Sequence, residues 1–151
     1  MDIRSDDLTS PQVHDLLAEH LRDMYRISPP ESVHALDLEG LRKPDVTFWA
    51  AWEQGELLGC GALKQIDPQH GEIKSMRTAL AHRRKGVARA ILELLLREAL
   101  CRGYVRLSLE TGAQPQFEPA RLLYERFGFA YCAPFEGYRE DPHSVFMTKQ
   151  L

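Results

Sequence analysis

Residues 81–96 read AHRRKGVARAILELLL, and they place four cations and a glycine directly before a strongly apolar helical pattern. The cations are Arg83, Arg84, Lys85 and Arg89, and the glycine is Gly86. A helix start exposes unpaired backbone N–H groups and the positive end of the helix dipole, and a glycine lets an anion approach them closely. The stretch has neither the P-loop spacing nor the three-glycine dinucleotide spacing. It predicts a diphosphate-binding helix start, with a solvated basic turn as the alternative.

The segments around this stretch predict a strand, a helix and a second strand in sequence. Residues 72–80 alternate imperfectly between apolar and polar side chains, residues 86–101 are apolar at helical spacing, and residues 105–109 are β-branched and aliphatic. A helix that connects two strands in this way makes those strands parallel neighbours in a sheet. Upstream, residues 46–53 and 56–65 are predicted to form a hairpin around a Gln-Gly turn.

The remaining segments add helices and one strand, without a repeat or linker that would mark a domain boundary. Helices are predicted over residues 12–26, 31–41 and 119–127, and a final strand over residues 144–149. At 151 residues and 44% hydrophobic composition, the chain is long enough to bury one core. We therefore expect a single α/β domain over residues 1–151 with a mixed sheet.

Charge and cysteine content exclude several classes of protein. The formal net charge of -3 gives no overall attraction to nucleic acid or anionic membranes, and no apolar run approaches the roughly 20 residues of a membrane helix. Cys60, Cys101 and Cys132 are widely spaced without a CxxC pair, and the histidines show no metal-ligand spacing. We expect a cytoplasmic protein with no metal site, nucleic-acid partner or membrane anchor. The oligomeric state stays open, a homodimer included.

Two motifs, in this order, resemble those of the GCN5-related N-acetyltransferase (GNAT) family. Arg83-x-x-Gly86-x-Ala88, at the end of the run MRTALAHRRKGVA, is similar to the acetyl-CoA signature of that family. The later run PARLLYERFGF is similar to its second motif through Ala120, Leu123, Tyr124, Gly128 and Phe129. The resemblance implies a GNAT fold, which is a mixed, mostly antiparallel central sheet with a parallel pair of strands that splay apart, flanked by helices.

The resemblance also implies that acetyl-CoA is the co-substrate. In the family, pantetheine bonds to backbone groups of the splayed strand, and the diphosphate sits at the following helix start. The residues of this chain at those places are Met76, Arg77, Thr78, Arg83, Arg84, Lys85, Gly86, Val87, Ala88 and Arg89. Many members carry Asn three residues before the alanine of the second motif. Here that position is Phe117, and the neighbouring Gln116 is a candidate substitute.

Transfer of an acetyl group to an amine needs a base for the amine and an acid for the departing thiolate. By resemblance, Glu72 lies at the offset of the catalytic glutamate of histone-acetylating members, and Tyr124 occupies the place of the general acid. Glu110, at the end of the next strand, and water are the competing bases. Glu72 could instead be a charged strand end that faces water, and Tyr124 a residue of the core.

The function implied by the resemblance is acetyl-CoA-dependent transfer to a primary amine, by direct attack in a ternary complex. We expect a small-molecule acceptor, whose identity the sequence does not give. The alternative is a catalytically silent coenzyme A-binding sensor or regulatory module, because one fold can serve both functions. Tyr138, Arg139 and Asp141 in the tail are candidates to line the acceptor side.

Overall fold

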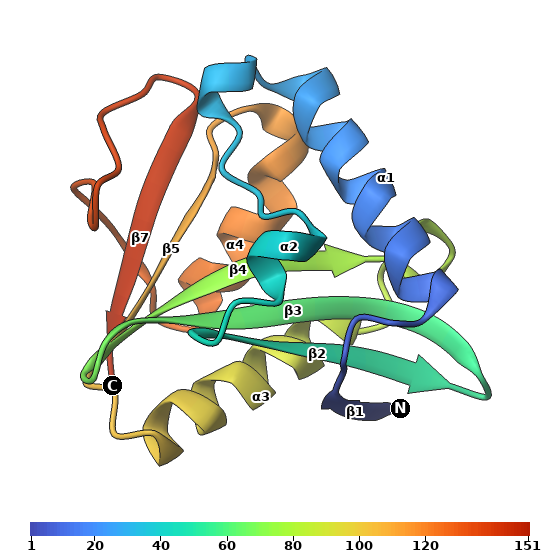
Figure 1. The fold of residues 1–151 in the computed structure, drawn as a ribbon. Coiled ribbons are helices and arrows are strands. Elements are labelled where there is room, and N and C mark those ends of the chain that lie inside the picture. Colours follow the sequence, from blue (N-terminus) through green and yellow to red (C-terminus); the bar gives the residue numbers. More distant parts are fainter.

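A seven-stranded mixed sheet forms the centre of the computed structural model, which describes all of residues 1–151 (Figure 1). The strands are β1 (Asp2–Ser5), β2 (Val46–Glu53), β3 (Glu56–Asp67), β4 (His70–Thr78), β5 (Arg106–Gly112), β6 (Ala130–Cys132) and β7 (Ser144–Gln150). They lie in the order β1-β2-β3-β4-β5-β7-β6. All neighbours are antiparallel except β4 and β5, which are parallel as the strand, helix and strand pattern predicted.

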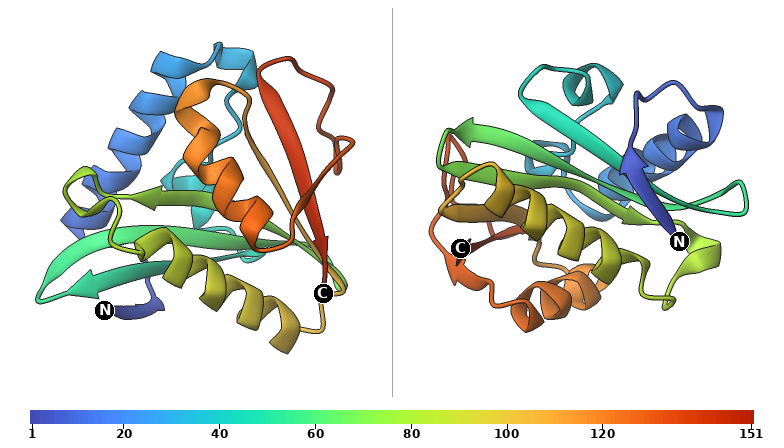
Figure 2. Two further views of the ribbon diagram at one scale, coloured as in Figure 1. Left: turned by 180° about the vertical axis from the view of Figure 1, so that it is seen from behind. Right: turned by 90° about the horizontal axis from the view of Figure 1, so that it is seen from below.

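Helices cover both faces of this sheet (Figure 2). They are α1 (Pro11–Ile27), α2 (Leu38–Leu41), α3 (Val87–Cys101) and α4 (Glu118–Arg126), with three single 3-10 turns, η1 (Pro30–Ser32), η2 (Leu80–His82) and η3 (Pro115–Phe117). One face carries α1 and α2, and the other carries α3 and α4. None of the helices is long and apolar enough to cross a membrane.

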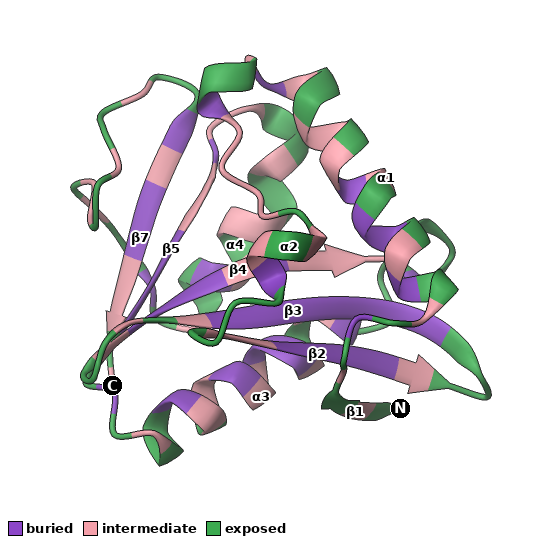
Figure 3. Ribbon diagram, viewed as in Figure 1, coloured by how far each residue is buried: buried purple, intermediate pink, exposed green.

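The central strands are buried on both faces because they lie between the two layers of helices (Figure 3). In β3, Leu58 and Leu63 belong to the core under α3 and α4, whereas Leu57, Cys60 and Ala62 belong to the core under α1 and α2. Burial of a leucine side chain stabilises a fold by about 1.5–3 kcal/mol. The continuous apolar run of β3 thus holds the two layers together, as expected for a strand buried on both sides.

The parallel pair separates part-way along its length. β4 and β5 are paired from His70 with Arg106 to Ile73 with Leu109. Beyond these residues β4 pairs only with β3, and β5 pairs only with β7. Figure 1 shows the two strands diverging. The predicted splayed pair is therefore confirmed, and we call the opening beyond Ile73 and Leu109 the fork.

A bulge in β4 accompanies this divergence. Ser75 has a φ of +54°, and the register between β3 and β4 shifts between Cys60 and Ala62. A non-glycine residue in the left-handed region is uncommon, and a bulge bends the strand that carries it. The bend contributes to the separation of the second half of β4 from β5.

The predicted helix over residues 31–41 is wrong. That segment contains η1, a stretch without regular structure and the single turn α2. The side chain of Asp37 accepts a hydrogen bond of 2.8 Å from the Gly40 N–H and so caps α2 at its start. The edge strands β1 and β6 were not predicted. The other predicted elements are confirmed within three residues of their bounds, the hairpin around Gln54 and Gly55 included.

Candidate active site

Gly86 begins α3 in a conformation that favours glycine. Its φ is +79°, and no atom beyond its chain neighbours lies within 4 Å of the position that a Cβ would occupy. The backbone N–H groups of Val87, Ala88 and Arg89 have no hydrogen-bond partner, and no side chain caps the helix. Free N–H groups and the helix dipole attract an anion, and the open space beside Gly86 allows a close approach. The start of α3 therefore fits a diphosphate.

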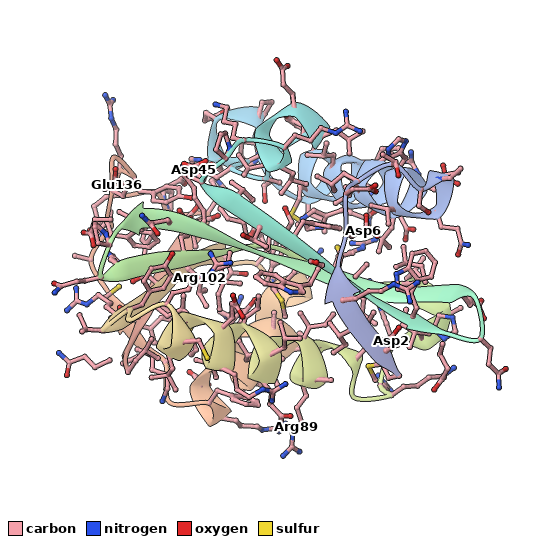
Figure 4. All side chains as sticks on the ribbon, turned by 60° about the horizontal axis from the view of Figure 1, so that its bottom comes forward. Asp2, Asp6, Asp45, Arg89, Arg102 and Glu136 are labelled. Atoms are coloured by element: carbon pink, nitrogen blue, oxygen red, sulfur yellow. The ribbon has the colours of Figure 1, made fainter.

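The cations around this helix start are exposed. Arg83 and Arg84 form no ion pair, and Lys85 Nζ lies 3.1 Å from His82 Nδ1. Arg89 projects outward from α3 (Figure 4). Exposed charges interact weakly in water. The backbone N–H groups are thus the groups best placed to hold an anion. Arg83 and Arg84, which form no ion pair, are free to interact with its negative charge.

The strand residues expected to bind the co-substrate have their backbone at the fork. Met76, Arg77 and Thr78 lie past the last pair between β4 and β5, so their edge on that side has no strand partner. Such an edge offers N–H and C=O groups to an extended ligand. The Arg77 side chain, however, is buried against α1, where Nη2 donates to Glu19 at 2.8 Å and to Asp23 at 2.6 Å. Any contact of Arg77 with a ligand in the fork must therefore come from its backbone.

Glu110 is the first residue of β5 beyond the last parallel pair, and so lies at the apex of the fork. Burial raises the pKa of its carboxyl to about 7, against the opposing effects of the Ser144 hydroxyl and Lys74. The Ser144 hydroxyl beside this carboxyl opposes the shift as a weak hydrogen-bond donor, without the geometry of a full hydrogen bond. A carboxyl with such a pKa can exchange protons near neutral pH.

Tyr124 points inward from α4 and is only 5% exposed. Its ring packs against Phe129 in an edge-on arrangement, with 5.8 Å between the ring centroids. Burial and the charge of Glu110 raise the pKa of the phenol. Tyr124 is therefore a residue of the core, as its helical spacing predicted, and its interaction with Glu110 also places it near the fork.

Glu72 lies inside β4 and is only 2% exposed. Its Oε2 accepts a hydrogen bond of 2.5 Å from the Tyr138 hydroxyl and one of 3.4 Å from Lys74 Nζ. The explanation of Glu72 as a charged strand end facing water is therefore wrong. Both of its partners are partly buried polar groups, and such hydrogen bonds are expected for a carboxylate removed from solvent.

Four side chains complete this network, of which Lys74 and His34 were not assigned to the site from the sequence and Tyr138 and Asp141 were named only as part of the tail. Lys74 Nζ donates to the carbonyl oxygen of His34 at 3.1 Å and to the Tyr138 hydroxyl at 2.9 Å. The rings of His34 and Tyr138 pack edge-on with centroids 4.9 Å apart. Asp141 accepts a hydrogen bond of 2.5 Å from η1. The sequence feature that could have predicted part of this network is the two-residue spacing from Glu72 to Lys74, which puts both side chains on one face of a strand.

Phe117 stands where many family members carry asparagine. Its ring lies in the space that a Cβ on Gly112 would occupy, so the glycine at the end of β5 accommodates the ring. Gln116 is exposed, and its suggested role as a substitute stays a prediction. No group of three or more His, Cys, Asp or Glu side chains is arranged to hold a metal ion.

Several known proteins resemble this chain over nearly its whole length. Residues 11–129 match the family described as Acetyltransferase (GNAT) family. YsnE of Bacillus subtilis (strain 168), described as an uncharacterized N-acetyltransferase, is 63% identical over 100% of both chains. YedL of Escherichia coli (strain K12), described in the same words, is 53% identical over 99% of this chain and 94% of its own length. An IAA acetyltransferase of Azospirillum brasilense is 40% identical over 93% of this chain and 89% of its own.

Solved structures share the fold. A Klebsiella pneumoniae protein assigned as an acyl-CoA N-acyltransferase superposes with a TM-score of 0.80 at 32% identity, over 99% of this chain and 97% of that one. A GNAT acetyltransferase of Elizabethkingia anophelis, solved with acetyl-CoA bound, has a TM-score of 0.70 at 20% identity, with the same coverage, and shows likeness of fold alone. With the fork and the start of α3 in their expected places, the chain belongs to the GNAT family of acetyltransferases.

Proposed function

We propose that this chain transfers the acetyl group of acetyl-CoA to a primary amine of a small molecule, by direct attack in a ternary complex. The observation that carries the proposal is the position of Glu110, a partly buried carboxyl at the apex of the fork, whose other arm, β4, leads through η2 into the open start of α3. A base, an open strand edge and an anion site on neighbouring elements are what acetyl transfer from a coenzyme A thioester requires.

The residues around the fork fit coenzyme A. The N–H groups of Val87, Ala88 and Arg89 would hold its diphosphate, with Gly86 leaving the approach open. The unpaired edge of β4 past Ile73 would accept the amides of pantetheine as a neighbouring strand would. When bound, acetyl-CoA supplies a thioester carbonyl for attack and a thiolate that leaves.

We assign the role of base to Glu110 rather than to Glu72. Glu72 already accepts hydrogen bonds from Tyr138 and Lys74, whereas Glu110 has no well-formed hydrogen bond and a pKa of about 7. A general base works best when its pKa lies near the operating pH. Glu110 would accept the proton of the incoming amine at a carboxylate oxygen. Glu72 would hold Tyr138 and Lys74 in place.

Tyr124 is the group best placed to act as acid. Its phenol carries its proton at neutral pH, as an ordinary tyrosine does, and burial together with Glu110 raises its pKa further. The Tyr124 hydroxyl would give this proton to the departing sulfur and regain one from solvent or from protonated Glu110 after release of product. A proton donor at the leaving group and a base at the amine together balance the protons of the reaction.

The acceptor side of the fork favours a small molecule. Asp141 and Tyr138, both in the loop between β6 and β7, contact η1 and His34 in the linker that follows α1. These contacts join two chain segments more than 100 residues apart across the acceptor side. A side closed in this way suits a small amine better than a polypeptide segment.

The experiment that tests the proposal is measurement of thiol release from acetyl-CoA with a panel of small primary amines. We expect release that depends on the amine and yields the N-acetylated product in equal amount. Binding of acetyl-CoA without release on any amine of the panel would contradict the proposal and would favour a coenzyme A-binding sensor or regulatory module. Product formed only with protein or peptide amines would contradict the small-molecule assignment.

A further inference from the structure

Five ionisable side chains gather on the acceptor side of the fork. Glu72 and Lys74 come from β4, Glu110 from β5, Asp141 from the loop before β7, and His34 from the linker after α1. They are close enough to act on one another. The pKa of His34 is lowered by burial and by Lys74, against the opposing charges of Asp141 and Glu72. The group therefore forms one electrostatic cluster with three carboxyls, one ammonium and a neutral imidazole.

The hydrogen-bond donors of this cluster are already used. Lys74 Nζ carries three donors, and it contacts the His34 carbonyl oxygen, the Tyr138 hydroxyl and Glu72. Arg121, at the start of α4, donates to two backbone carbonyl oxygens, at 2.7 Å and 3.0 Å. Arg139, the other cation of the β6–β7 loop, is exposed. A substrate carboxylate would find no free buried cation here.

The acceptors, in contrast, are free. Glu110 has only the weak contact with the Ser144 hydroxyl, and Ser144 Oγ, in a residue that is 8% exposed, has no other partner. Each Asp141 oxygen accepts one hydrogen bond, from Ser32 at 2.5 Å and from the His143 N–H at 2.8 Å, which leaves further lone pairs. A buried polar atom without a partner costs about 1–3 kcal/mol, so a ligand that donates hydrogen bonds here is favoured.

We propose that the acceptor is a primary amine that carries a second cationic group, with the reacting amine at Glu110 and the second cation facing Asp141. The inference rests on the proposed function, because it assigns the substrate class of the same site. Lys74 pairs with Glu72, so Asp141 and the ionised form of Glu110 give the cluster an excess of negative charge that attracts a dication and repels a substrate carboxylate.

The test compares matched amines with the same protein. Putrescine carries two amines, butylamine carries one, and γ-aminobutyrate replaces the second amine by a carboxylate. We expect kcat/KM for putrescine to exceed that for butylamine about tenfold or more, which corresponds to about 1.4 kcal/mol, and γ-aminobutyrate to be the poorest. Cadaverine, which is one methylene longer, measures the spacing that the site prefers.

Two variants locate the second cation. Asp141→Asn should lower the ratio of kcat/KM for putrescine to that for butylamine toward one, because it removes the negative charge and keeps the shape. Glu136→Gln is the matched control, since Glu136 is an exposed carboxylate of the same loop (Figure 4) and should leave the ratio at the wild-type value. Thermal melts of both variants establish that they are folded.

The outcomes separate this inference from the function on which it rests. Turnover of butylamine at least equal to that of putrescine would overturn the inference and leave acetyl transfer intact. A ratio that falls equally in both variants would also overturn it. If putrescine binds the complex of protein and coenzyme A in calorimetry but is not acetylated, the recognition site stands and the proposed chemistry fails. If putrescine neither binds nor reacts, the inference is wrong.

Discussion

The hydroxyl of Tyr138 donates a 2.5 Å hydrogen bond to the carboxylate of Glu72, 66 residues earlier in the chain. The same hydroxyl accepts a hydrogen bond of 2.9 Å from Lys74. The Tyr138 ring is itself packed edge-on against His34 and Phe135. One side chain thus fixes the position of the β6–β7 loop over β4 and holds the buried carboxylate of Glu72 in one orientation.

Tyr138→Phe removes this hydroxyl and keeps the ring packing. We expect the free energy of unfolding to fall by about 1.5–3 kcal/mol, as for other hydrogen bonds to charged groups. We also expect kcat/KM for amine acetylation to fall, because Glu72 and Lys74 lose their common partner. Tyr131→Phe is the matched control, since Tyr131 is 52% exposed. Chemical denaturation and steady-state kinetics check both. A Tyr138→Phe protein that equals the control in both measurements would show that the contact has no role.

Gly86 and Gly103 form a matched pair at the two ends of α3. Their φ values are +79° and +80°, and neither has an atom beyond its chain neighbours within 4 Å of the Cβ position. Replacement by alanine strains either backbone by about 1–2 kcal/mol. Both variants should therefore melt at similarly lower temperatures. Only Gly86→Ala should weaken acetyl-CoA binding in calorimetry, because only Gly86 borders the free N–H groups. Equal affinities in the two variants would place the diphosphate elsewhere.

Tyr124→Phe removes only a hydroxyl from a side chain that stays packed in the core. If the phenol protonates the leaving thiolate, kcat should fall by on the order of 10²-fold with little change in melting temperature. Tyr104→Phe provides the comparison, because Tyr104 is also buried and its hydroxyl lies at the other end of the sheet, 3.1 Å from Gln65. A rate as high in Tyr124→Phe as in the wild type would leave Tyr124 with a packing role only.

Sequence patterns within single segments predicted most helices and strands, because residues close together in the chain determine most of these elements. The turn at Gln54 and Gly55 has positive φ at both residues and sets the hairpin. Helices α1, α3 and α4 follow from apolar spacing. The short strands β1 and β6 could not be predicted, because each is defined by pairing with a distant strand, β2 or β7. The prediction of one helix after Pro30 failed for a related reason, since the apolar residues of this segment pack against the sheet from an irregular stretch and the single turn α2.

Some features of the candidate site could likewise be predicted from the local sequence, and others could not. Gly86 and the cations before it could be found from sequence, because a helix start is a local feature. The environment of Glu72 could not, since it depends on Tyr138 from the far end of the chain. The burial that raises the pKa of Glu110 likewise arises only when β4, β5 and β7 come together. Arg77 was assigned to the co-substrate as part of the splayed strand, and the ion pairs of its side chain with α1 leave no trace in the local sequence.

The pKa of Glu110 also predicts a dependence of stability on pH. Its ordinary value of 4.5 is raised to about 7 in the fold, so between these values the folded protein holds a proton that the unfolded chain has lost. The contribution of the Glu110 carboxyl to the free energy of unfolding is therefore fully present below about pH 4.5 and is lost as the pH rises through about 7. The Glu110→Gln variant should exceed the wild type in free energy of unfolding by about 3 kcal/mol more at pH 8 than at pH 4. Urea unfolding at both pH values measures this difference, and a constant difference would contradict it.

The most direct test of the assignment of Glu110 is the pH dependence of kcat at saturating amine for the wild type, Glu110→Gln and Glu72→Gln. The wild-type rate should rise with pH and level off near pH 7, where the Glu110 carboxyl loses its proton. Glu110→Gln should be slower by about 10²-fold or more and should lack this inflection, whereas Glu72→Gln should be slower but keep it. An inflection that survives in Glu110→Gln and disappears in Glu72→Gln would contradict the account.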